Sequence, residues 1–288
     1  MSRRRKLFPT DHGLTVRMLA AAVLTPLVVL AALAVIVLIA PVKLLIGIGI
    51  AAVVGIVSSV RARAEAVRGR ELTPAEAPEL HAVVERLCVV ADLPKPRIVV
   101  EAERQPNSWV VSVGRDNARL HVTRGLLDRL DAHELEAVVG HELAHIAHRD
   151  ATVMTLVGGP GAVLVGGGAR MARGGWWPMQ IGALIAWAIG KVAGLGTLAL
   201  SRYREFAADA GAVALTGNPA ALAAALMKVS EGVVAVPSRD LRAVAARDPF
   251  HLLPVAEAKS RLLATHPTLQ ARIARLERLE SRLQTFRP

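Results

Sequence analysis

Long stretches without charge occupy the early part of this 288-residue chain and limit the folds open to it. Residues 18–40 form a run of about 23 residues, which is enough for a helix to cross a hydrocarbon core of roughly 30 Å. A second run, 42–60, follows directly after Pro41. A secretory signal peptide has an apolar core of only about 7–15 residues. The two runs therefore predict a transmembrane helical hairpin.

Basic residues stand at both ends of this hairpin. Arginines cluster at residues 3–5 and again at residues 61–70, in a chain whose net charge is +11. Because positively charged residues favour the cytoplasmic side of a membrane, the N-terminus and the chain after residue 61 are predicted to be cytoplasmic. Nucleic-acid binding is the other explanation for a basic chain. We disfavour it because no zinc-finger, homeodomain or RNA-module motif is present.

Two more apolar runs lie further along, at residues 151–169 and 179–200. The first is rich in glycine, and the second follows Trp176 and Trp177, residue types that gather at membrane–water interfaces. The pair predicts a second hairpin. The alternative is that residues 151–200 lie on the membrane or dip into it without crossing.

The rest of the sequence predicts a mainly helical α+β body. A capping box at Thr73–Glu76 predicts the start of a helix over residues 74–90. Short valine-rich segments between turn residues predict strands at 97–100, 109–113 and 119–122. A second capping box, formed by Asp131 and Glu134, opens a helix with apolar residues at helical spacing.

That last helix carries the motif His141-Glu142-Leu143-Ala144-His145. Residues four apart share one face of a helix, so the imidazoles of His141 and His145 can reach the same zinc ion. Glu142 lies beside that face, where a carboxylate can hold a water molecule and take its proton. The motif predicts a zinc-dependent hydrolase.

A catalytic zinc normally takes a third protein ligand. Glu205 is the candidate, and Asp209 one turn later can accept the far N–H of a ligand histidine. Because His145 and Glu205 must reach the same ion, the insert between them must cross the membrane an even number of times. These considerations predict four parts, namely a hairpin (1–62), the first part of the protease domain (63–150), an inserted hairpin (151–200) and the second part of the protease domain (201–288).

Four segments in this order resemble the HtpX-type membrane metalloproteases, relatives of the CAAX prenyl endopeptidase. They are Gln105–Trp109, His141–His145, Arg204–Asp209 and Thr265–Arg272. The resemblance covers nearly the whole chain. It implies a gluzincin-like fold with about four transmembrane helices in two hairpins.

The resemblance also implies one Zn²⁺ per chain, bound by His141, His145 and Glu205. Glu142 would be the general base, and Asp209 would support a ligand histidine from behind.

Three further roles come from the same resemblance. His266 and Arg272 would stabilise the oxyanion or orient the site, and Asn107 would lie on the strand edge that pairs with the substrate backbone. The family usually has Asn-Ala-Phe at that edge, whereas this chain has Asn107-Ser108-Trp109.

The function implied is an integral-membrane zinc endopeptidase of a bacterial-type cell membrane, with both termini and the active site in the cytoplasm. Its expected partners are the lipid bilayer and misfolded or damaged membrane proteins, as in a stress response. One alternative is a CAAX-type endopeptidase acting on lipidated C-termini, a branch that normally has more spans than four. The other is a membrane scaffold with a structural zinc, a kind of site that needs no general base such as Glu142.

Overall fold

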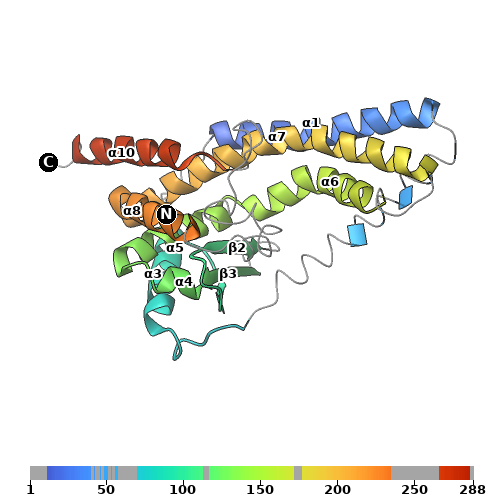
Figure 1. The fold of residues 1–288 in the computed structure, drawn as a ribbon. Helices are drawn as coiled ribbons and strands as arrows, with labels where there is room; N and C mark the ends of the chain where they lie inside the picture. The colour runs from blue at the N-terminus through green and yellow to red at the C-terminus, as the bar shows by residue number, and fades with distance from the viewer. Residues whose placement is uncertain are drawn as a thin grey trace, which may run out of the picture. The chain divides into compact units, whose positions relative to one another are not determined.

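A computed structural model describes residues 12–39, 70–112, 117–171, 177–234 and 266–285, with a few single residues between 42 and 57 (Figure 1). The chain forms two compact units, each built from separate stretches of sequence. The first comprises Met1–Leu14, Gly69–Thr152 and Arg202–Pro288, and the second comprises Thr15–Arg68 and Val153–Ser201. The predicted run 42–60 and the basic clusters beside it lie mostly outside the described residues.

The first unit contains a three-stranded sheet with the strand order β1-β3-β2. β1 (Arg97–Glu101) runs parallel to β3 (Ala118–Thr123), and β2 (Ser108–Ser112) runs antiparallel to it. The three strands predicted from the sequence are confirmed to within one residue at each end. β2 lies at one edge of this sheet, where a further extended segment can join it.

Helix α3 (Pro78–Ala91) begins later than the sequence pattern predicts, because the predicted start was residue 74. A residue before proline is disfavoured in the helical conformation, and Ala77 has φ −145° and ψ 66°. The Glu76 carboxylate instead accepts a hydrogen bond from the backbone N–H of Thr73 at 2.9 Å. The capping residues therefore close a turn that precedes the helix.

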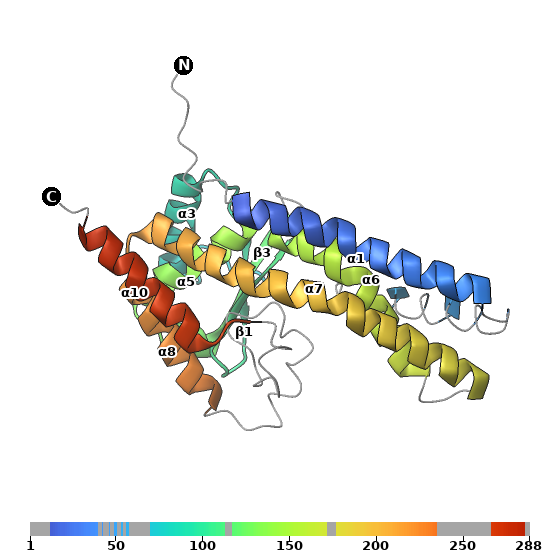
Figure 2. The ribbon, with the colours of Figure 1, turned by 90° about the horizontal axis from the view of Figure 1, so that it is seen from above.

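Helix α5 (Ala132–Ala147) packs against α3, β2 and α8 (Pro219–Val234). The capping box predicted at its start is confirmed, with the Glu134 N–H donating to Asp131 and the Asp131 N–H donating to Glu134, both at 2.9 Å. Its apolar positions Val138, Val139 and Leu143 are buried in the core of this unit. Helix α10 (Leu269–Thr285) lies beside α8 (Figure 2). The short α4 (Arg124–Leu127) follows β3.

The second unit contains α1 (His12–Ile39) from residue 15 onward, most of α6 (Asp150–Met171) and the first part of α7 (Trp177–Thr216). Glycines bring α6 and α7 close together. A Cβ on Gly168 would lie 2.5 Å from the Ala183 carbonyl oxygen, and one on Gly190 would lie 2.6 Å from that of Gly161. The glycine-rich run thus allows backbone-to-backbone helix packing.

The mainly helical α+β architecture predicted from the sequence is confirmed. Helix α7 continues to Thr216, so the predicted boundary at residue 200 falls inside it. Within the described ranges, no helix is both long enough and apolar enough to span a membrane.

Candidate active site

The three motif residues lie on α5 as the sequence predicts. His141 and Glu142 are almost completely buried, and His145 is slightly more accessible. The Nε2 atoms of the two histidines are 3.1 Å apart, and their rings meet edge-on at an interplanar angle of 89°. The helix therefore directs both imidazoles at one point in space.

Glu205, from α7, completes a group of three potential metal ligands. Its carboxylate oxygens lie 3.6 Å from His141 Nε2 and 3.7 Å from His145 Nε2. Two ligands at about 2.0–2.1 Å from a tetrahedral zinc are roughly 3.3 Å apart. The three separations fall around that value, so the group fits a zinc ion.

Unsatisfied atoms in this group also point to a cation. Glu205 Oε2 is buried and accepts no hydrogen bond from the described residues. When the Nδ1 atoms of His141 and His145 carry the protons, both Nε2 atoms offer a lone pair toward the same point. Buried polar atoms normally have a partner, and a metal ion would serve all three residues.

The far nitrogen of His141 is held by a buried ion pair. Nδ1 lies 3.0 Å from Asp209 Oδ1, and Arg272 donates to both Asp209 oxygens at 2.9 and 2.6 Å. A carboxylate can only accept, so the Nδ1 of His141 carries a proton, and Nε2 would be the nitrogen that binds a metal ion. Asp209 thus lies against the far nitrogen of His141.

The far nitrogen of His145 is held in the same way by residues that the sequence analysis missed. Nδ1 lies 2.6 Å from Asp150 Oδ2, and the Arg204 Nε lies 3.0 Å from the same oxygen. Asp150 reaches back because Arg149, just past the end of α5, has a left-handed backbone (φ 57°) that redirects the chain into α6. Each ligand histidine is therefore backed by an aspartate that an arginine holds.

The two predicted residues near the C-terminus converge on Glu205. His266 Nδ1 lies 3.7 Å from Glu205 Oε2, and Arg272 Nη1 lies 3.6 Å from the same atom. Both side chains are buried. The structure thus brings both next to Glu205, the predicted third ligand, with Arg272 also bound to Asp209.

Asn107 lies immediately before the edge strand β2 and is almost fully buried. Its backbone N–H donates to Thr123 Oγ1 at 2.9 Å, and its side-chain oxygen accepts from the Ser108 N–H at 2.9 Å. It therefore anchors the start of that strand. Ser108, another residue that the sequence analysis missed, donates from Oγ to Glu142 Oε1 at 2.6 Å. This contact puts the edge of the sheet against the predicted general base.

The electrostatics of the group favour a cation. Burial lowers the pKa of His141, but its contacts with Asp209 and Glu205 outweigh burial and raise that pKa to about 9. Burial raises the pKa of Glu205, yet His266 and His141 hold it well below its usual value. Burial raises the pKa of Glu142 above its usual value. A raised pKa suits a carboxylate that must accept a proton.

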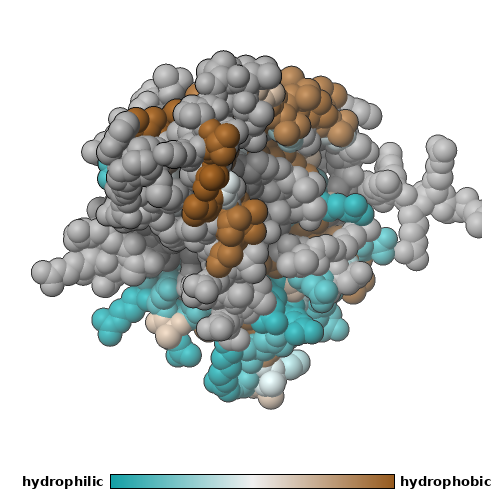
Figure 3. All heavy atoms as spheres, turned by 90° about the vertical axis from the view of Figure 1, so that its right-hand side faces the viewer, coloured by the Kyte–Doolittle hydropathy of each residue, from teal (hydrophilic) through white to brown (hydrophobic). Residues whose placement is uncertain are grey.

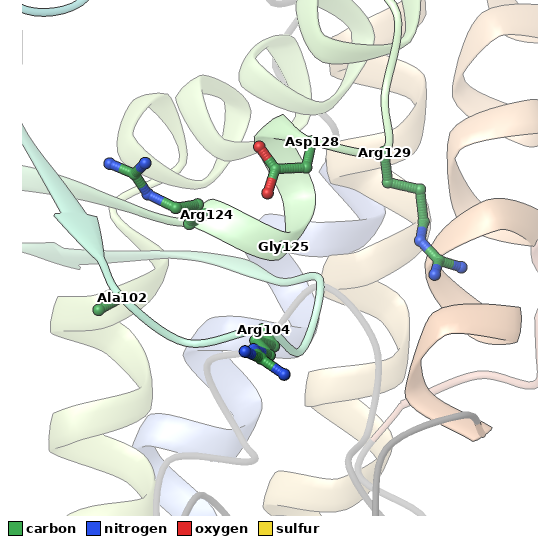
Figure 4. Close-up of a pocket in the computed structure, with 6 residues that line it drawn as sticks. All are labelled: Ala102, Arg104, Arg124, Gly125, Asp128 and Arg129. Atoms are coloured by element: carbon green, nitrogen blue, oxygen red, sulfur yellow. The ribbon is translucent and has the colours of Figure 1, made fainter.

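A separate pocket of about 660 Å³ lies at the junction of the β1–β2 loop and α4. It is lined by Ala102, Arg104, Arg124, Gly125, Asp128 and Arg129 (Figure 4). In Figure 4 the three guanidinium groups point in different directions, so they do not converge on one ligand. None of the predicted site residues lines this pocket.

Two histidines and two glutamates converging from α5 and α7, beneath the edge of a small sheet, are the arrangement of a metallopeptidase. Residues 74–280 match the profile of Peptidase family M48. The chain belongs to this family and is of the HtpX type. These assignments make it a metalloprotease.

Two relatives that match along nearly their full length support this assignment. The "Protease HtpX homolog" of Moorella thermoacetica is 37% identical over 98% of this chain and 100% of its own length. The "Protease HtpX homolog 1" of Streptomyces coelicolor is 38% identical over 96% of both chains. The crystal structure of S. mikatae Ste24p is similar at 18% identity and a TM-score of 0.44, over 67% of this chain and 49% of that one.

Proposed function

We propose that this protein is an integral-membrane zinc endopeptidase that cleaves misfolded or damaged membrane proteins. The observation that carries the zinc assignment is the spacing of the His141, His145 and Glu205 ligand atoms, which lie 3.1 to 3.7 Å apart. One Zn²⁺ per chain would be held by these three residues. When bound, zinc supplies a Lewis acid that polarises a carbonyl group and makes water a stronger nucleophile.

Glu142 is the general base in this proposal. Its carboxylate takes a proton from the attacking water and passes it to the nitrogen of the departing amine, as general acid–base catalysis of peptide hydrolysis requires. Support comes from its place beside the ligand pair, from its burial and from its raised pKa. Burial also keeps competing bulk water away from the carboxylate.

The supporting residues then have separate tasks. Arg272 orients His141 through Asp209, since it donates to both oxygens of that carboxylate. His266 is the candidate for stabilising the negative charge that develops on the substrate carbonyl oxygen. Substrate would lie extended along β2, with Asn107 fixing the start of that strand. The contact between Ser108 and Glu142 supports this placement, because it links β2 to the base.

Membrane insertion is the further part of the proposal, with four spans, cytoplasmic termini and a cytoplasmic active site in a bacterial-type cell membrane. Large apolar side chains are exposed along α1, at Val16, Leu19, Val23, Leu24, Leu27, Val28 and Leu30. Others are exposed on α7, at Ile181, Leu184, Trp187 and Val192. Figure 3 shows apolar side chains at the molecular surface as brown spheres. Surfaces of this kind are typical of contact with lipid or with a partner.

Replacing the base tests the catalytic part. Purified full-length Glu142→Gln should bind one zinc per chain and cleave casein at least about 100-fold more slowly than the wild type. Glu136→Gln is the matched control, because Glu136 lies on the same helix and pairs with Arg86. It should retain activity. Proteolysis that persists in zinc-loaded Glu142→Gln would refute the mechanism, and a zinc-loaded wild type without proteolysis would indicate a scaffold.

Reporter fusions test the topology. Fusions at Pro41 and Arg173 should report the non-cytoplasmic side and a fusion at Pro288 the cytoplasm. A cytoplasmic signal at Arg173 would contradict the second hairpin.

A further inference from the structure

Ser108 makes a contact that the zinc-ligand motif does not call for. It is the first residue of β2, its side chain is 1% exposed, and its hydroxyl donates to Glu142 Oε1 at 2.6 Å. Hydrogen bonds from a hydroxyl to an ionised carboxylate are short, at about 2.5–2.7 Å, and roughly twice as strong as neutral ones. This distance therefore indicates a charge-assisted bond.

The strand fixes the backbone that carries this hydroxyl. The Ser108 N–H donates to the Asn107 side chain at 2.9 Å, and Ser108 is paired in register with Val122 of β3. The Asn107 N–H is held in turn by Thr123. The backbone of Ser108 is thus fixed, and its hydroxyl meets Glu142 from a set position on the strand.

The bond also distinguishes the two oxygens of the carboxylate. Among the described residues, Ser108 supplies the one hydrogen bond that Glu142 receives, and it goes to Oε1. Oε2 is therefore the oxygen that the Ser108 bond leaves available to a reacting group.

We propose that Ser108 is a positioning residue for the general base, and that its bond to Oε1 turns Oε2 toward the attacking water. The inference rests on the proposed function. In the reaction the proton of water goes to Oε2, while Oε1 keeps the hydrogen bond from Ser108 throughout. Ser108 itself neither gains nor loses a proton.

The first experiment measures kinetics of full-length Ser108→Ala. We expect kcat to fall about tenfold, a part of the roughly 10²–10⁴-fold that a general base contributes. KM should change less than twofold, and zinc should remain at one per chain because Ser108 contacts no ligand. Thr216→Val is the control, since it also removes an internal hydroxyl, one that donates to the Ala212 carbonyl and not to Glu142. Its kcat should match the wild type. An unchanged kcat in Ser108→Ala overturns the proposal.

A double-mutant cycle separates positioning from general loss of packing. Glu142→Asp shortens the base by one methylene, so that its carboxylate no longer reaches Ser108. In that background Ser108→Ala should lower kcat no further. An equal fall in both backgrounds would mean that Ser108 acts through the fold alone.

Crystal structures give a readout that does not depend on activity. The Glu142 carboxylate should have one orientation in the wild type and more than one in Ser108→Ala. A single, unchanged orientation in the variant contradicts the inference. Failure of the proposed function is recognised separately, because the wild type would then show no zinc-dependent proteolysis at all.

Discussion

Replacing Asp150 with asparagine tests whether the second aspartate–arginine pair supports the metal. Asp150 is 1% exposed and lies 2.6 Å from the far nitrogen of His145. Burial raises its pKa, but Arg204 and His145 hold the pKa below its usual value, so the carboxylate is ionised at neutral pH. The substitution keeps the shape of the side chain and removes its charge.

The expected effect is a loss of zinc affinity. Removing an outer partner of a ligand histidine typically costs 10- to 100-fold in metal affinity, which is about 1.4–2.7 kcal/mol. An asparagine oxygen can still accept a hydrogen bond from His145 Nδ1, so Asp150→Asn should weaken zinc binding by about tenfold, the lower end of that range. Asp150→Ala removes the acceptor as well and should approach 100-fold. Arg204, itself buried, then loses its ion-pair partner and the fold is weakened too.

Zinc affinity is measured by competition with a chromogenic chelator at pH 7, on the full-length protein. Asp128→Asn is the control, because Asp128 is exposed and lines the separate pocket near α4. It should bind zinc as the wild type does. A zinc Kd for Asp150→Asn within twofold of the wild type, with an unchanged Tm, would show that Asp150 does not support His145.

Two further predictions concern stability. Gly190→Ala should lower Tm, because the added Cβ would lie 2.6 Å from the Gly161 carbonyl oxygen. Gly194→Ala is the control and should leave Tm unchanged or raise it, because a Cβ there meets nothing within 4 Å. Equal Tm values for the two variants would contradict the close packing of α6 and α7. The backbone N–H of Glu134 lowers the pKa of Asp131 in the folded protein. The charge of Asp131 therefore contributes its full stability above the unfolded-state pKa of about 3.9. That contribution is lost as the pH falls through the lower pKa of the folded state. Asp131→Asn keeps the cap but not the charge, so the Tm difference from wild type should be present at pH 6 and close toward pH 3; a difference that is constant with pH would contradict this.

The sequence predicted those parts of the site that depend on local geometry. Residues four apart on a helix share a face wherever the helix lies, so the His141 and His145 pair followed from spacing alone. The capping box at Asp131 is equally local. Glu205 could be anticipated because zinc needs a third ligand, and Asp209 because it follows one turn later.

The parts that escaped prediction depend on local backbone conformations or on contacts between distant segments. Asp150 reaches His145 only because Arg149 adopts a left-handed backbone conformation. The local sequence did not predict that conformation. Ser108 reaches Glu142 because β2 packs on α5, a tertiary contact. The start of α3 was misplaced for a local reason, since the influence of Pro78 on Ala77 outweighed the capping pattern before it.

The paired aspartates and arginines also determine the charge balance of the site. Glu142, Glu205, Asp209 and Asp150 contribute four carboxylates against the guanidinium groups of Arg272 and Arg204. With neutral imidazoles, two negative charges remain, and one divalent cation cancels them. A monovalent cation would leave a buried charge uncompensated, which is costly in a protein interior.

The raised pKa of His141 is a response to the same excess of negative charge. A proton and a divalent cation therefore compete for its Nε2 lone pair. Acidification should therefore weaken metal binding at His141.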